Sequence, residues 1–256
     1  MRDFTLKKYK QLLEAALAGG YTLTSYHNYI LNNEKYNRVF ILRQDVDKRP
    51  GNSLQTALLQ NELGATASYY FRIVKQSFNP AIIEKIAKLG HEIGYHYEEV
   101  ATENGNIEKA YSSFQKNLEH IRKYYPVKTI CMHGSPFSKW DNRLLWKKYD
   151  YRTLGIIGEP YFDLDFNKVL YITDTGRKWN GDSVSVRDKV NSNFDFSFSS
   201  TSQIITSLKN NELPDVIMQN IHPQRWNDNY YFWTKELVVQ NVKNIVKSFL
   251  VKNSDR

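Results

Sequence analysis

The 256-residue sequence contains a single cysteine, Cys131, so no internal disulfide can form. Such scarcity of cysteine is typical of proteins that work in a reducing compartment. No run approaches the roughly 18 consecutive apolar residues of a membrane span, and the first residues lack the apolar segment of a signal peptide. We therefore expect a cytoplasmic protein with no membrane span.

The sequence also lacks a dense basic block and a glycine fingerprint for a dinucleotide. Its 35 lysines and arginines outnumber its 27 acids, for a formal net charge of +8, but they are scattered along the chain. This scatter predicts no nucleic-acid partner; it fits a solvated basic surface or attraction to an anionic substrate, such as a sugar carrying phosphate. The missing fingerprint argues against a dinucleotide cofactor.

Apolar strand-like runs alternate with amphipathic helices along the chain. Strands are predicted at 21–23, 38–42, 67–73, 92–96, 129–132, 153–157, 169–172 and 215–219. Helices are predicted at 6–17, 24–31, 50–63, 80–89, 107–124, 142–149, 201–209 and 233–251. This alternation predicts an α/β fold with a mostly parallel sheet covered by helices. Without a dinucleotide fingerprint, a closed or nearly closed barrel of about seven strands fits better than a doubly wound sheet.

Residues 41–47, with the sequence ILRQDVD, form an apolar run that ends in Asp45 and Asp47. Because strand side chains alternate faces, both carboxylates project to the same side. Two carboxylates at the C-terminal end of a strand are costly unless they meet a metal, a base or a substrate. The other interpretation is an exposed pair that closes the strand into the turn at 48–51.

Acids and histidines follow other predicted strands at the end where parallel barrels carry their chemistry. They are His96, His133, Asp174 and His222. A lone His96 is more often a core histidine, but with Asp47 it makes half of a catalytic zinc site. His222 either serves as a general acid, a role that suits histidine near neutral pH, or simply ends a strand. Asp174 either caps a turn or orients another side chain, and Arg177 either lies on the surface or binds an anionic group.

Six segments, in this order, resemble the polysaccharide deacetylase superfamily, the NodB-homology group of carbohydrate esterases, and within it the WbmS-like branch tied to surface-polysaccharide gene clusters. They are 43–47 (RQDVD), 90–98 (GHEIGYHYE), 132–136 (MHGSP), 158–161 (GEPY), 173–179 (TDTGRKW) and 221–226 (IHPQRW). The resemblance implies a distorted (β/α) barrel of NodB-homology type, with residues 1–256 forming a single polysaccharide-deacetylase-like domain.

The resemblance also implies an activity and a set of site residues. The protein would be a metal-dependent deacetylase that hydrolyses an N- or O-acetyl group on a sugar or glycan precursor in surface-polysaccharide biosynthesis. Its divalent metal would be zinc, with cobalt or nickel as alternatives. Asp45 resembles the general base, His222 the general acid, and Asp47 and His96 two metal ligands. The expected substrate-binding residues are Asp174, Arg177, Trp179, Glu98 and Arg225.

Two positions depart from the superfamily pattern. A second metal-binding histidine usually stands four residues after the first, and here that position is Val100. Because it too ends a strand, His133 is the preferred replacement ligand, with Glu98 or Glu99 as alternatives. The position before the aspartate pair is histidine in many relatives, and here it is Gln44.

A second hypothesis follows from Val100. The chain would then be a catalytically altered or inactive deacetylase-like barrel that acts as a carbohydrate-binding protein. Its stacking surfaces would be Tyr95, Tyr97, Trp140, Trp179 and Trp226. Retention of both Asp45 and Asp47 favours the enzyme, because a pure binding protein has no need for two converging carboxylates. The sequence leaves the sugar and the oligomeric state open.

Overall fold

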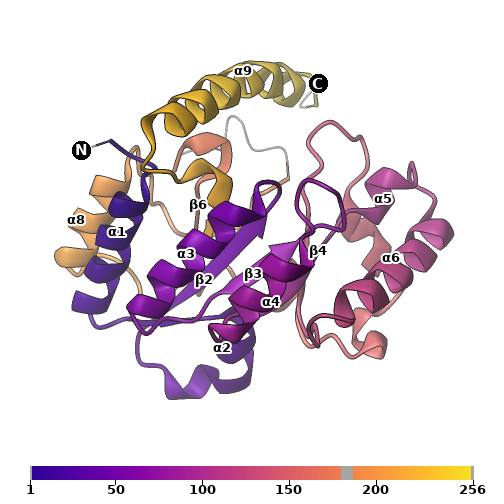
Figure 1. Cartoon of the computed structure of the whole chain (residues 1–256), viewed down its shortest axis with the longest axis horizontal. Helices are drawn as coiled ribbons and strands as arrows, with labels where there is room; N and C mark the ends of the chain where they lie inside the picture. Colours follow the sequence, from indigo (N-terminus) through magenta and orange to yellow (C-terminus); the bar gives the residue numbers. More distant parts are fainter. Residues whose placement is uncertain (1, 180–186, 255–256) are drawn as a thin grey trace.

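The computed structural model describes residues 2–179 and 187–254. Seven strands form one sheet in which every pairing is parallel. The order is β5-β4-β3-β2-β7-β6, with β1 paired to β2 outside this path. Figure 1 shows β2, β3 and β4 side by side in this order. The strands are β1 (Thr22–Thr24), β2 (Val39–Val46), β3 (Ser68–Phe71), β4 (Glu92–Tyr97), β5 (Ile130–Met132), β6 (Leu170–Thr173) and β7 (Val216–Ile221). The parallel, barrel-like α/β fold expected from the sequence is confirmed.

Helices surround this sheet. The α-helices are α1 (Leu6–Ala18), α2 (Tyr26–Asn32), α3 (Pro50–Glu62), α4 (Pro80–Lys88), α5 (Glu99–Thr102), α6 (Ile107–Arg122), α7 (Pro160–Asp163), α8 (Thr201–Lys209) and α9 (Tyr230–Ser254). Short 3₁₀ helices are η1 (Asn33–Lys35), η2 (Asn142–Lys147), η3 (Tyr151–Leu154), η4 (Thr175–Arg177) and η6 (Pro223–Arg225). Side chains such as Thr5, Asn79 and Ser200 cap the starts of α1, α4 and α8, satisfying N–H groups that have no helical partner. No helix in the described part of the chain is long and apolar enough to cross a membrane.

Strand β2 is the centre of the sheet. All eight of its residues are buried, as expected for a parallel strand covered on both faces. Its first half pairs with β1 and its second half with β3, while β7 runs along its other edge. Asp45 and Asp47, at the C-terminal end of β2, therefore lie at the centre of the sheet rather than at its edge.

The prediction of a strand at 153–157 is wrong. Residues Tyr151–Leu154 form η3, which begins at a cap from Asp150 and ends at Gly155 in the left-handed region (φ 71°). In the described residues, the only strand-like pairing beside β5 in this segment is one isolated parallel bridge between Thr129 and Gly158. The sheet path therefore ends at β5 and β6 rather than closing. The helix expected at 142–149 is likewise a 3₁₀ helix, η2.

Gln44 points away from the aspartates, into a polar network beneath α3. Its Nε2 donates to the Tyr9 hydroxyl over 3.1 Å, and Gln60 Nε2 donates to the same hydroxyl over 2.8 Å. Because position 44 faces the opposite side of β2 from Asp45, a side chain there is directed away from the carboxylates. Its departure from the superfamily pattern therefore removes no ligand from the aspartate site.

Candidate active site

Each strand on the main path of the sheet is followed directly by an ionisable side chain. These residues are Asp47, Arg72, Glu98, His133, Asp174 and His222. Because the strands are parallel, all six residues leave the sheet at the same end. All but Asp174 line a cavity of about 510 Å³.

Three imidazoles converge on Asp47 in this cavity. The Nε2 atoms of His96 and His133 lie 3.7 and 3.6 Å from its Oδ1. Nε2 of His222 lies 3.8 Å from its Oδ2. These separations are too long for hydrogen bonds. They are close to the roughly 3.4 Å between two ligands of a tetrahedral zinc ion with bonds of about 2.1 Å.

The other ring nitrogen of each histidine is anchored by an oxygen. His96 Nδ1 donates to the carbonyl of Cys131 over 2.9 Å, and His133 Nδ1 donates to the Glu98 carboxylate over 2.9 Å. His222 Nδ1 lies 2.6 Å from the Asp174 carboxylate. A proton on Nδ1 leaves the lone pair on Nε2, the atom that faces Asp47. The rings of His96 and His133 are therefore oriented as metal ligands require.

The carboxylate of Asp47 has an unused acceptor. Its Oδ1 is buried and has no hydrogen-bond partner among the residues that the structure describes, whereas its Oδ2 accepts from Gln224 Nε2 over 3.3 Å. Burial opposes its charge, but the imidazoles, His222 foremost, and Arg72 outweigh it and hold the pKa of Asp47 well below its usual range. An ionised, buried oxygen beside two imidazole nitrogens is costly unless a cation completes it. Asp47, His96 and His133 therefore fit a divalent metal ion.

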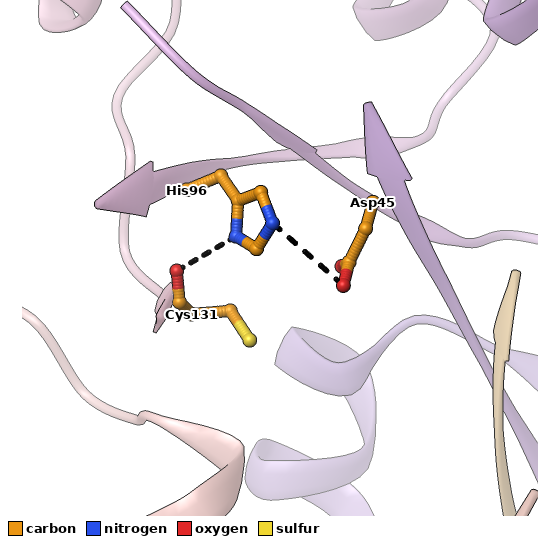
Figure 2. Close-up of side chains that lie close together, drawn as sticks. All are labelled: Asp45, His96 and Cys131. Carbon is orange, nitrogen blue, oxygen red and sulfur yellow. Dashed lines mark hydrogen bonds and ion pairs between the residues drawn. The ribbon is translucent and has the colours of Figure 1, made fainter. Parts of the chain in front are cut away.

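A second group of potential ligands, Asp45, His96 and Cys131, lies beside the first. One ligand atom from each falls within 4.8 Å of the others. Figure 2 shows the His96 ring between the two, with Nδ1 toward the Cys131 carbonyl and Nε2 toward Asp45. However, both Asp45 oxygens already accept hydrogen bonds, and burial raises the pKa of the Cys131 thiol. The Asp47 group, which has the partnerless oxygen, is the better site for a cation.

Asp45 is held by Arg43, two residues earlier on the same face of β2. The guanidinium forms a two-point ion pair, Nε to Oδ1 at 2.9 Å and Nη2 to Oδ2 at 2.7 Å. Asn220 Nδ2 donates to Oδ2 over 3.0 Å. Burial disfavours the charge on Asp45, but Arg43 outweighs burial and keeps the pKa of this carboxyl below its usual value. Asp45 is therefore ionised and held in a fixed orientation.

Asp174 does not line the cavity but binds the side chain and backbone of His222. The carboxylate is fully buried and accepts from the backbone N–H and Nδ1 of His222 and from the indole of Trp226. Arg225 Nη1 gives its two N–H groups to the carboxylate and the carbonyl of Asp174, at 2.5 and 2.7 Å. The Nδ1 proton of His222 therefore goes to Asp174, as in a carboxylate–histidine pair that supports a charged imidazolium.

The expected substrate-binding residues fall into two groups. Glu98 and Arg225 line the cavity, although Glu98 is also paired with Arg72 and His133. Arg177 donates to the Trp233 carbonyl, and the indole of Trp179 donates to Thr201 in the core. Neither is among the described residues that line the cavity. Substrate contact by any of the five stays a prediction.

Of the three candidates to replace the ligand missing at Val100, the structure brings His133 to Asp47. Val100 itself is a fully buried core residue. Glu99 is buried against Asn117, while Glu98 anchors His133. Four of the five expected stacking surfaces, Tyr95, Tyr97, Trp179 and Trp226, are also core residues, so they expose almost no ring face to a sugar.

Arg43 and Arg72 were missed by the sequence analysis. Arg43 carried a signal, since it shares the strand face of Asp45 at a spacing of two residues. Arg72 directly follows β3, as His133 follows β5, and its pair with Glu98 (2.7 and 2.9 Å) fixes the anchor of His133.

No protein-family model matches the sequence, and no curated protein matches it. Several solved structures do. The CE4 domain of a multidomain xylanase from the hindgut metagenome of Trinervitermes trinervoides is 12% identical (85% of this chain, 84% of that chain, TM-score 0.39). A CE4 family pseudoenzyme from Bacillus anthracis is 11% identical (83% and 64%, TM-score 0.42), and the peptidoglycan deacetylase PdaC from Bacillus subtilis is 11% identical (84% and 96%, TM-score 0.39). These matches do not bear on the WbmS-like branch.

Proposed function

We propose that this protein is a metal-dependent deacetylase that hydrolyses an N- or O-acetyl group on a sugar or glycan precursor. The observation that carries the proposal is the convergence of three imidazoles on Asp47, with Nε2 atoms 3.6 to 3.8 Å from its oxygens. The sequence resemblance supplies the substrate class and the role in surface-polysaccharide biosynthesis.

Asp47, His96 and His133 would hold the metal, which we propose to be zinc, with cobalt or nickel as alternatives. Imidazole nitrogen and carboxylate oxygen are the ligands of catalytic zinc sites that keep one position open. When bound, the cation polarises an acetyl carbonyl and lowers the pKa of the attacking water. Burial lowers the pKa of His96 to about 4, so this ring is neutral near pH 7, as a ligand must be.

The remaining steps belong to Asp45 and His222. Water adds to the acetyl carbon while Asp45, held ionised by Arg43, accepts the water proton. The bond between the acetyl carbon and the sugar nitrogen or oxygen then breaks, and His222 donates a proton to the departing amine or alcohol. Acetate is the other product. Asp174 stabilises the charged imidazolium of His222 before it gives up that proton.

The charged residues that line the cavity favour a substrate with an anionic group, such as an acidic glycan precursor. Lys243 and Arg187 line the cavity, whereas Lys48, also in the lining, is paired with Glu236. Arg187 donates to the carbonyls of Gly134 and Ser135 and so fixes the loop after His133. A cavity with cations on its wall attracts a phosphorylated or otherwise acidic sugar.

The test is acetate release from a panel of N- and O-acetylated sugars and sugar phosphates by metal-loaded protein. We expect activity in the wild type and a loss of about 10²- to 10⁴-fold for Asp45→Asn and for His222→Gln, as for removal of a general base or acid. The matched controls are Asp165→Asn and His27→Gln, which lie outside the lining of the cavity. Full activity in Asp45→Asn, or no acetate release from any member of the panel, would argue against a deacetylase.

A further inference from the structure

Helix α9 has its polar side facing the protein. In Figure 1 it runs along the top edge of the molecule, with α2 at the opposite edge. Glu236, Gln240 and Asn244, four residues apart, are all buried. Asn244 donates to the Gly176 carbonyl, and Glu236 pairs with Lys48 and Arg49. Glu236 and Gln240 also line the active-site cavity.

The opposite side of α9 is apolar and faces solvent. The exposed side chains include Tyr231, Phe232, Val238, Val239, Val242 and Val246. Val242, near the middle, is 58% exposed, and Tyr231, near the start, is 64% exposed. A surface helix in a monomeric soluble protein shows the reverse pattern, with its apolar stripe toward the core. A contiguous exposed apolar surface of this kind marks an interaction site.

The charges on this outer side have one sign. Lys235 is exposed on it, and Lys243, which also lines the cavity, is exposed at its edge. Glu236, the one acid between residues 230 and 246, is turned inward to its cationic partners. The guanidinium of Arg2 lies over the rings of Tyr230 and Trp233 at the start of the helix. Aromatic rings, aliphatic side chains and lysines on one exposed face are the composition of helices that lie in a membrane interface.

We propose that the outer face of α9, defined by Tyr231, Phe232, Val238, Val239, Val242 and Val246 with Lys235 and Lys243, binds the surface of an anionic lipid bilayer. The helix would lie in the plane of the interface with its valines among the acyl chains and its lysines at the headgroups. The inward side of the same helix would keep the cavity next to the lipid surface. This inference does not depend on the chemistry proposed for the cavity.

A second copy of the chain is the competing occupant, and charge argues against it. Packing two outer faces together would bring lysines toward lysines, with no acid among the described residues of either face to pair with them. Anionic headgroups instead offer each lysine a counter-charge worth about 1 kcal/mol, or about a fivefold change in partitioning.

The test is co-sedimentation of the full chain with vesicles of phosphatidylcholine alone or of phosphatidylcholine and phosphatidylglycerol in equal parts. We expect binding to the anionic vesicles, weakened by salt. Lys235→Gln should lower partitioning about fivefold and Val242→Glu by more than about tenfold. The matched control is Leu31→Glu, which places the same charge on an exposed leucine of α2. Thermal unfolding of each variant checks that the fold is retained.

The proposal is overturned if the wild type binds neither vesicle, or if Leu31→Glu weakens binding as much as Val242→Glu. A lipid-free dimer that Val242→Glu dissociates, without vesicle binding by the wild type, would assign the face to a second copy instead. The metal content of the same samples, which the α9 variants should leave unchanged, separates a failure here from a failure of the proposed deacetylase.

Discussion

Nε2 of His133 lies 3.6 Å from Oδ1 of Asp47, although β3 and β4 separate the strands that precede these residues. The curved sheet brings the two strand ends to one cavity. The His133 imidazole thus reaches Asp47 from another strand, and Val100 packs in the core. The site is assembled by the fold rather than by local spacing.

Glu98 should control metal affinity without being a ligand. Its carboxylate fixes the His133 ring through Nδ1 and is itself held by Arg72. We expect Glu98→Gln to lower metal affinity about 10- to 100-fold, as is usual for partners of ligating histidines. Competition with a zinc-binding dye measures this. Glu84→Gln, at an exposed position of α4, is the control, and equal affinity in the two variants would mean that Glu98 does not support the metal.

Removal of Arg43 should destabilise the fold through Asp45. Both side chains are almost fully buried, so Arg43→Met leaves an uncompensated carboxylate in the core. We expect a loss of about 3 to 5 kcal/mol in the free energy of unfolding. The double variant Arg43→Met/Asp45→Asn should recover part of that loss, because the orphaned charge is gone. Urea unfolding measures both; a double variant less stable than the single one would contradict this view.

Asp174→Asn should reduce catalysis while sparing the metal. The amide cannot stabilise an imidazolium on His222 as the carboxylate does. We expect kcat to fall about 10²- to 10⁴-fold on the substrate found in the acetate-release panel. Metal content should remain at the wild-type level. Loss of metal together with activity would instead make His222 part of the metal site.

Glu159 should make stability depend on pH. Burial raises the pKa of its carboxyl to about 7, even though it accepts hydrogen bonds from the backbone of Met132 and Tyr161. Between pH 4.5 and 7 the folded state keeps a proton that the unfolded state releases, so stability falls as pH rises through this window. The contribution amounts to about 3 kcal/mol.

Urea unfolding across this pH range tests the effect of Glu159. Glu159→Gln should make the slope of stability against pH more positive than in the wild type, because the amide does not titrate. The lowered pKa of His96 adds an opposite slope to both proteins and leaves this difference unchanged. Glu119→Gln, at an exposed position of α6, should keep the wild-type slope. A wild-type slope in Glu159→Gln would assign the pH dependence to other groups.

The sequence predicted most of the sheet and the placement of the site at its C-terminal end. Buried strands are encoded by runs of apolar residues, so the sequence predicted β2 and β7. The face shared by Asp45 and Asp47 followed from the alternation of side chains along a strand. The expected strand at 153–157 failed because local capping by Asp150 and the left-handed Gly155 outweighed a short apolar run.

The partners within the site were less predictable. Arg43 and Arg72 act through pairs formed across strands or along one, and a basic residue after an apolar run has no distinctive pattern. The prediction that aromatic residues form a sugar-stacking surface was wrong for four of its five residues for a similar reason. Aromatic rings such as those of Tyr97 and Trp226 can stack on a sugar, but they pack equally well in a hydrophobic core. In this fold both rings are buried in the core.

Elemental analysis of metal content tests the central claim most directly. The variants are Asp47→Ala, His96→Ala, His133→Ala and, as a control at the neighbouring ligand group, Cys131→Ser. We predict about one divalent ion per chain in the wild type and in Cys131→Ser, and loss of the ion in the other three. A wild type that binds no metal when zinc, cobalt or nickel is supplied would contradict the account. So would a metal that survives Asp47→Ala but is lost in Cys131→Ser.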